Sequence, residues 1–225
     1  MCAAPHRWNY NDGATMYDLE EQEKLDELKA WWKQYGQMVI VVALAACVGA
    51  AGAFGWLAYK RTQSEQASRL YGALEKAMQA NDLKQIRNVS GQLMDQFGGT
   101  AYGPMAALAG AKANFEAGDA QAAAAQLRWA MEHARDEGVA ATARLRLAAV
   151  LLDQKKYDDA LKLLGGGYPD AFAGLFEDQK GDIYAAQGKT GEAKAAYKTA
   201  LEKLPAGGNY RQIVQVKLDG LGSDQ

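Results

Sequence analysis

The 225-residue chain has a formal net charge of −2, 49% hydrophobic residues and only four prolines. Few helix breakers and many strong helix formers predict an all-α protein and argue against a sheet protein. Acidic and basic residues nearly balance from Thr62 onward, which disfavours nucleic acid as a partner, because nucleic acid needs a clustered basic face. Cys2 and Cys47 both precede that part of the chain, so it holds no disulfide framework and no cysteine-ligated metal.

Residues 1–37 are expected to form an acidic, cytoplasmic N-terminal tail. Residues 1–15 lack periodicity, and Met16 is an alternative start that would leave them outside the native protein. From Met16, apolar residues at helical spacing predict a helix, which begins with the capping-box-like pair Asp18 and Glu21. Two interpretations of this helix stay open: a juxtamembrane helix that lies on the bilayer, or an acidic recognition element.

Residues 38–59, MVIVVALAACVGAAGAFGWLAY, are predicted to form a transmembrane helix, because they contain no charged side chain. At about 1.5 Å per residue, the helix would be roughly 33 Å long and would cross the hydrocarbon core of a bilayer. Aromatic residues, which favour the membrane interface, stand near both ends. They are Trp31, Trp32, Tyr35, Trp56 and Tyr59.

Three glycines of the span, Gly49, Gly52 and Gly55, are predicted to pack against another membrane helix. Small residues let two helices approach closely and attract each other by dispersion. The alternative is the ordinary tolerance of a membrane helix for small residues. The basic residues around the span do not decide its orientation, because long domains are translocated largely regardless of charge.

From residue 60 the chain follows a pattern of helix, short turn and helix. Its most complete unit resembles the tetratricopeptide repeat at Gly181, Tyr184, Gly188, Ala193, Tyr197, Ala200 and Pro205, and departs from it at Glu177 and Lys180. Weaker copies place Ile86, Ala123 and Ala160 at the position of Ala193, with spacings of 37, 37 and 33 residues. The pattern predicts an α-solenoid of about four hairpins over residues 60–225, with a closing helix near 210–218.

No motif in the chain predicts catalysis. The two histidines, His6 and His133, are too few for a histidine metal site or a triad. Gly98-Gly99 and Gly165-Gly166-Gly167 are interpreted as helix ends, since they lack the lysine and the strand context of a phosphate loop. Asp178 and Asp182, one helical turn apart, are interpreted as an ordinary pair on a solvated helix. We therefore expect no enzyme, no metal and no cofactor.

In tetratricopeptide stacks the first helix of each hairpin lines a concave groove. Carrying those positions over predicts a protein-binding strip, which we call the apolar strip: Tyr71, Met78, Met105, Leu108, Phe115, Leu145 and Leu152. The fourth hairpin would add Leu175, Asp178 and Asp182. A lining with methionine and aromatic side chains suits varied hydrophobic clients. The alternative is that these residues are buried inside a tightly wound stack.

The order of acidic tail, single span and degenerate repeats resembles the YfgM family of bacterial inner-membrane proteins. The most specific stretch is YDLEEQEKLDELKAWWKQYG, residues 17–36, and the resemblance runs from Met16 to the C-terminus. Residues 1–15 depart from the family pattern.

The resemblance implies an ancillary subunit of the SecYEG translocon with its repeat domain in the periplasm. Together with the periplasmic chaperone PpiD, such a subunit would act as a chaperone or adaptor for newly exported, unfolded proteins. The alternative in another functional class is a cytoplasm-facing membrane scaffold that assembles a complex without touching unfolded clients.

Overall fold

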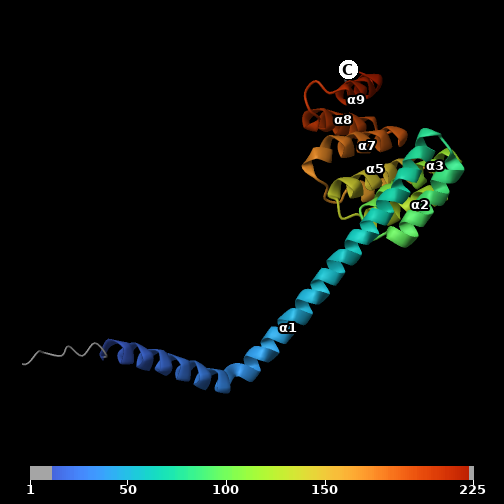
Figure 1. Ribbon diagram of the computed structural model, residues 1–225. Coiled ribbons are helices and arrows are strands. Elements are labelled where there is room, and N and C mark those ends of the chain that lie inside the picture. Colours follow the sequence, from blue (N-terminus) through green and yellow to red (C-terminus); the bar gives the residue numbers. More distant parts are fainter. Residues whose placement is uncertain (1–11, 223–225) are drawn as a thin grey trace, which may run out of the picture. The chain divides into compact units, whose positions relative to one another are not determined.

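The computed structural model describes the backbone of residues 12–222 and the side chains of residues 23–222. The chain divides into two compact units, residues 1–59 and 60–225. Every regular element within residues 12–222 is helical (Figure 1). The expectation for residues 1–15 falls largely outside the described residues.

Helix α1 (Asp12–Gln79) starts in the first unit and continues into the second. The predicted start at Asp18 is therefore wrong, because the helix already begins at Asp12. Residues 14–17 contain neither proline nor glycine, so nothing in the local sequence interrupts the helix before Asp18. Asp18 lies inside the helix and is not its N-cap.

Within the described residues, α1 is the one helix that is long and apolar enough to cross a membrane. Large apolar side chains of residues 38–59 point outward on all sides and are covered by none of the described residues. The rings of Trp31 and Tyr35 lie 5.9 Å apart before this segment, and those of Trp56 and Tyr59 lie 6.0 Å apart at its end. A helix that is apolar all round and flanked by aromatic residues fits a membrane-spanning segment.

The second unit consists of stacked helical hairpins that follow one another from α2 to α9 (Figure 1). The C-terminal part of α1 pairs with α2 (Leu83–Phe97), α3 (Tyr102–Glu116) with α4 (Ala120–His133), α5 (Glu137–Asp153) with α6 (Tyr157–Leu164), and α7 (Ala173–Ala186) with α8 (Thr190–Lys203). A 3-10 turn, η1 (Asp170–Phe172), precedes α7, and α9 (Asn209–Gly220) closes the stack. The predicted tetratricopeptide-like fold of four hairpins and a closing helix is confirmed for the described residues.

Each hairpin turns through one residue with a left-handed backbone, and these residues share the spacing of the repeat. They are Asn81, Gly118, Lys155 and Gly188, with φ between 53° and 82°. In the first two hairpins the next residue caps the second helix: Asp82 accepts from the Gln85 backbone at 3.0 Å, and Asp119 from the Ala122 backbone at 2.9 Å. The repeat is therefore encoded in the turn backbone as well as in the core.

The position shared by the four repeats lies in the core of every hairpin. Ile86, Ala123, Ala160 and Ala193 are all buried. In three of the four repeats this residue is alanine, which lets the two helices of the hairpin cross closely, and in the first repeat it is isoleucine; burying it away from water stabilises each pair. The predicted equivalence of these four residues is confirmed.

The last hairpin crosses more closely than a side chain at Gly181 would allow. A Cβ atom on Gly181 would lie 2.4 Å from the Tyr197 ring, so only glycine fits beneath that ring. Helix α8 ends at Lys203, and Leu204 takes the extended backbone (ψ 143°) that a following proline imposes. Gly181 therefore permits the close crossing of α7 and α8, and Pro205 follows the end of α8.

Candidate functional site

The apolar strip predicted from the sequence lies on the first helices of three hairpins and is only partly covered. Met78, Met105 and Phe115 are 38%, 38% and 41% exposed. The other four members, Tyr71, Leu108, Leu145 and Leu152, are half-buried against the core. None of the seven is fully buried, so each presents some apolar surface to solvent.

Helix α3 contributes the most open part of the apolar strip. Met105, Leu108 and Phe115 fall on one side of this helix, because residues three, seven and ten positions apart share a face. The Leu108 carbonyl accepts from Arg146 at 3.4 Å, which ties α3 to α5. On α1, the Tyr71 ring lies 5.4 Å from the Tyr102 ring, and burial raises the pKa of its phenol, with further contributions from Glu75 and Tyr102. Such a surface can hold apolar side chains but carries no reactive group.

The fourth hairpin carries a buried polar cluster instead of a solvated acidic pair. Asp178 is only 2% exposed, and the Nζ of Lys217 donates to both of its carboxylate oxygens at 2.9 Å. The same ammonium donates to Asp182 at 2.8 Å. The Tyr210 hydroxyl donates to Asp178 at 2.6 Å, and the Tyr197 hydroxyl donates to Asp182 at 2.7 Å. Interpreting Asp178 as a solvated residue was therefore wrong, because α9 covers it.

The groups in this cluster stabilise one another's protonation states. Burial by itself lowers the pKa of Lys217, but hydrogen bonds and charge from Asp182 and Asp178 outweigh burial, and the pKa is raised. Burial raises the pKa of Tyr197, and its hydrogen bond to Asp182 raises it further. Burial acts in the same direction on Tyr210, together with its hydrogen bond to Asp178. The lysine thus stays charged and the phenols stay neutral at ordinary pH.

Helix α9 is fastened to the rest of the unit by the polar cluster and by a second contact. The guanidinium of Arg211 donates to the Leu201 carbonyl and, at 3.5 Å, to the Leu204 carbonyl. These carbonyls belong to the last turn of α8 and the residue that follows it, where backbone acceptors lack helical partners. The arrangement closes the stack and offers no open coordination position. We interpret it as structural.

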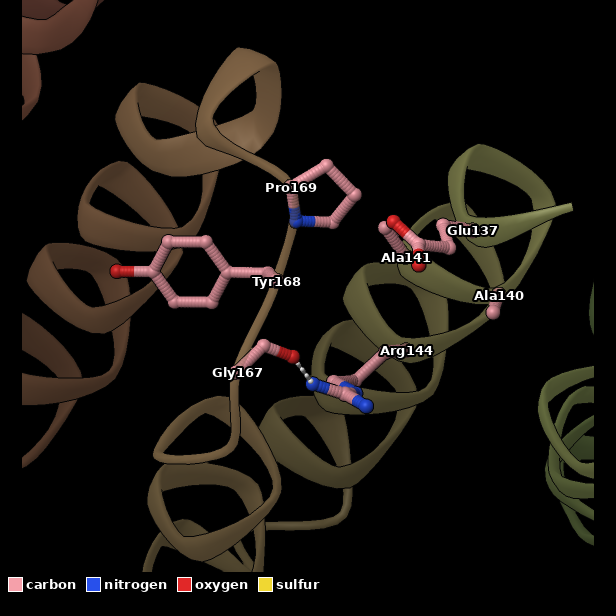
Figure 2. A pocket seen from close by; sticks show the side chains of 7 residues that line it. All are labelled: Glu137, Ala140, Ala141, Arg144, Gly167, Tyr168 and Pro169. Carbon is pink, nitrogen blue, oxygen red and sulfur yellow. Dashed lines mark hydrogen bonds between the residues drawn. The ribbon is translucent and has the colours of Figure 1, made fainter.

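A cavity of about 360 Å³ lies between α5 and the segment that joins α6 to η1. One wall is a stripe of α5 formed by Glu137, Ala140, Ala141 and Arg144, and the other is Gly167–Pro169 (Figure 2). Arg144 donates to the Gly167 carbonyl at 2.6 Å and so joins the two walls. Figure 2 shows the Pro169 ring on the side facing α5, while the Tyr168 ring points away from α5.

The α5 wall of the cavity carries two residues of opposite charge, Glu137 and Arg144, with two alanines between them. Glu137 and Arg144 are seven residues apart on α5, which is about 10 Å along a helix. Three residues of an extended peptide cover about the same length. The cavity therefore suits a short stretch of extended polypeptide. The sequence did not reveal it, although the run Gly165-Gly166-Gly167 was a signal: a Cβ on Gly166 would lie 3.2 Å from Arg144.

Among the described side chains, no three histidine, cysteine, aspartate or glutamate residues lie close enough together to hold a metal ion. His133 lies at the end of α4, where its ring stacks on Trp129 at 4.2 Å and its Nδ1 lies 2.9 Å from the Trp129 carbonyl.

The three glycines of the span present open backbone. A Cβ added to Gly49, Gly52 or Gly55 would meet no atom of the chain within 4 Å. Their surface is free for another helix, and the packing predicted there stays a prediction.

Comparisons with known proteins match the chain over most of its length. A family model described as a tetratricopeptide repeat-like domain matches residues 29–223. The chain is 34% identical over 204 residues to a protein of Neisseria gonorrhoeae named ancillary SecYEG translocon subunit, covering 90% of this chain and 98% of that protein. Proteins of the same name from Haemophilus influenzae and Escherichia coli are 32% and 24% identical, over 91% and 89% of this chain and 99% and 96% of their own lengths.

Proposed function

Since this chain belongs to the family of ancillary SecYEG translocon subunits, we propose that it is a non-catalytic inner-membrane protein that assists newly exported proteins beside the Sec translocon. The proposal places the N-terminus in the cytoplasm and the repeat unit in the periplasm, where the chaperone PpiD would be a partner. The translocon in the relatives' names and the candidate span of α1 support the inner-membrane location, and the orientation is carried over from the family resemblance.

Orientation is tested by fusing a reporter that is active only in the periplasm to the C-terminus. We expect activity from this fusion and none from an N-terminal fusion. If the C-terminal fusion shows no reporter activity although the protein is present in the membrane, the proposed function is contradicted. It would favour the cytoplasm-facing scaffold instead.

Client binding is proposed to use the apolar strip, and its partly exposed side chains are the observation that carries this part of the proposal. An unfolded, newly exported chain exposes apolar segments, and contact with the strip would remove apolar surface of both partners from water. Methionine and aromatic side chains adapt to differently shaped apolar segments, which suits clients of varied sequence. The cavity beside Arg144 lies on the same helix, α5, as Leu145 and Leu152 and would hold a short extended stretch of the same client.

Phe115→Glu is the sharpest test of the apolar strip. Because Phe115 is 41% exposed, a charge at this position stays solvated, and the free energy of unfolding should change by only about 0.5–1 kcal/mol. Client affinity should fall about tenfold or more, since a few apolar anchors carry most of the affinity of an interface. Thermal unfolding and suppression of client aggregation are measured together on the same variant.

The matched control is Ala125→Glu, which adds the same charge to an exposed position on α4. It should leave both unfolding and aggregation suppression unchanged. If Phe115→Glu unfolds at a much lower temperature, Phe115 belongs to the core. If it unfolds normally and still suppresses aggregation, clients bind elsewhere.

The glycines of the span are proposed as the contact with a membrane partner. Replacing Gly49, Gly52 and Gly55 together by leucine should preserve insertion, because leucine is more apolar, but should weaken copurification with SecYEG by blocking close helix approach. The control is leucine at Ala43, Cys47 and Ala50, which lie on the opposite side of the helix. Equal copurification of the two triple variants would show that the glycines are not the contact.

A further inference from the structure

Residues 23–35 of α1, in the blue part of the ribbon in Figure 1, carry an apolar surface that no described side chain covers. Its large side chains are between 43% and 59% exposed: Leu25, Leu28, Trp31, Trp32 and Tyr35. A run of five such side chains on one short helix is a contiguous patch, which marks a site of interaction with another molecule or with a membrane.

The patch occupies one side of the helix and the acidic residues occupy the other. At about 100° per residue, the five apolar side chains fall within a stripe roughly 120° wide. The acidic residues Glu23, Asp26 and Glu27 lie on the far side of the helix axis. Lys24 lies just inside one edge of the stripe and Lys29 lies about 40° beyond the other edge, whereas Lys33 lies on the far side with the acidic residues.

This distribution of charge fits a lipid surface better than a protein that recognises the acidic residues. Lys24, at the edge of the stripe, can extend its ammonium group to lipid phosphates while its alkyl stem stays on the apolar side. A partner that bound the acidic face would leave the tryptophans and leucines in water. The acidic face is also partly neutralised within the helix, since Lys29 pairs with Asp26 at 2.9 Å and both side chains are 75% exposed.

The patch also lies directly before the candidate span. Only 13 residues, or about 20 Å of helix, separate Leu25 from Met38, so the patch cannot move far from the bilayer. Gly36 stands between the two segments, and a glycine inside a helix weakens it and allows the chain to change direction there. A Cβ on Gly36 would lie 3.2 Å from the Trp32 ring, so glycine also leaves room for that indole.

We propose that residues 23–35 are an interfacial helix that lies on the bilayer beside the span, with Leu25, Leu28 and Trp32 at the boundary between headgroups and acyl chains. The helix sets the depth of the span in the membrane and keeps the N-terminal segment at the lipid surface. This inference requires only that residues 38–59 cross a membrane. It does not depend on clients, on PpiD or on the orientation of the repeat unit.

The test compares two neighbouring positions, Leu28 in the middle of the apolar stripe and Glu27, which lies outside it about 100° further round the helix. In the full chain with Cys2→Ala and Cys47→Ala, a nitroxide label is attached at Leu28→Cys or at Glu27→Cys, and the protein is reconstituted into vesicles of phosphatidylcholine and phosphatidylglycerol. Collisions of the label with dissolved oxygen and with a water-soluble nickel complex are measured. We expect the label at position 28 to collide several-fold more often with oxygen, and several-fold less often with nickel, than the label at position 27.

Equal access of nickel to both labels would place the helix in water and overturn the proposal. If the label at position 28 becomes shielded from both oxygen and nickel only when SecYEG is added, the patch binds a protein, and the proposal is also overturned. Vesicles of phosphatidylcholine alone show which part of the lipid the helix contacts. If positions 27 and 28 still differ in depth, the contact is with the acyl boundary; if the difference is lost, the contact is with anionic headgroups. Both results agree with the proposal.

Discussion

Lys217→Met is expected to lower the free energy of unfolding by about 3–5 kcal/mol, because it leaves the buried Asp178 carboxylate without its ion-pair partner. For a unit of this size the melting temperature should fall by roughly 10 °C. Asp178 cannot escape to water without releasing α9, so the loss should extend to the packing of that helix. Thermal unfolding of the full chain in detergent micelles, followed by far-ultraviolet circular dichroism, measures the change.

Two further variants decide the cause. Lys203→Met removes an exposed lysine from the last turn of α8 and should cost no more than about 0.5 kcal/mol. Asp178→Asn combined with Lys217→Met removes the buried charge together with its partner and should recover a large part of the loss. If Lys217→Met costs less than about 1 kcal/mol, the cluster does not hold α9.

The same cluster predicts a loss of stability in alkali. Folding raises the pKa of Lys217, Tyr197 and Tyr210, so above about pH 10 the folded state binds more protons than the unfolded state. The contribution of these groups to stability is complete below pH 10 and declines as the pH rises further. Thermal unfolding of the wild-type chain, followed by circular dichroism at pH values from 8 upward, should show this decline.

Gly181→Ala is expected to cost about 3 kcal/mol, although it adds a single methyl group. The new Cβ would lie 2.4 Å from the Tyr197 ring. The ring cannot move aside, because Tyr197 is buried and its hydroxyl is held by Asp182. Overpacking at a fixed site costs about 1–3 kcal/mol, and the fixed ring places this variant at the upper end. Denaturant unfolding provides the measurement.

Gly91→Ala is the matched control, since Gly91 also lies inside a helix but a Cβ there would meet nothing within 4 Å. Alanine at position 91 should stabilise the protein by about 0.5–1 kcal/mol, because it restricts the unfolded chain and favours the helix. A similar gain from Gly181→Ala would show that the last hairpin crosses less closely than described.

The repeat architecture could be predicted from sequence because its signals are local and recur. The geometry of one hairpin requires a small residue where its helices cross and a turn residue between them. The small residues are Ala123, Ala160 and Ala193, and the turn residues include Gly118 and Gly188. The span could be predicted for a similar reason, since a helix in lipid must be apolar all round over a fixed length. Both predictions needed only neighbours within about forty residues of sequence.

The start of α1 was predicted less well. The pair Asp18 and Glu21 has the spacing of a capping box, but a capping box forms only where the helix has to begin. Helix α1 runs back to Asp12, and residues 14–17 contain no proline or glycine that would end it. A local motif was outweighed by the absence of a breaker before it.

The sequence by itself thus determined the class of fold, the span, the four hairpins and the family resemblance, because periodicity and composition encode them. Only the tertiary structure decided that Asp178 is buried, since its partner Lys217 lies 39 residues away on a helix that contributes no other charge to the cluster. The cavity between Glu137, Arg144 and Gly167 likewise depends on how α5 meets the segment before η1. Each contact of this kind joins two residues that are distant in the sequence and does not recur at a fixed spacing. It therefore leaves no periodic signal in the sequence and is seen only in the folded structure.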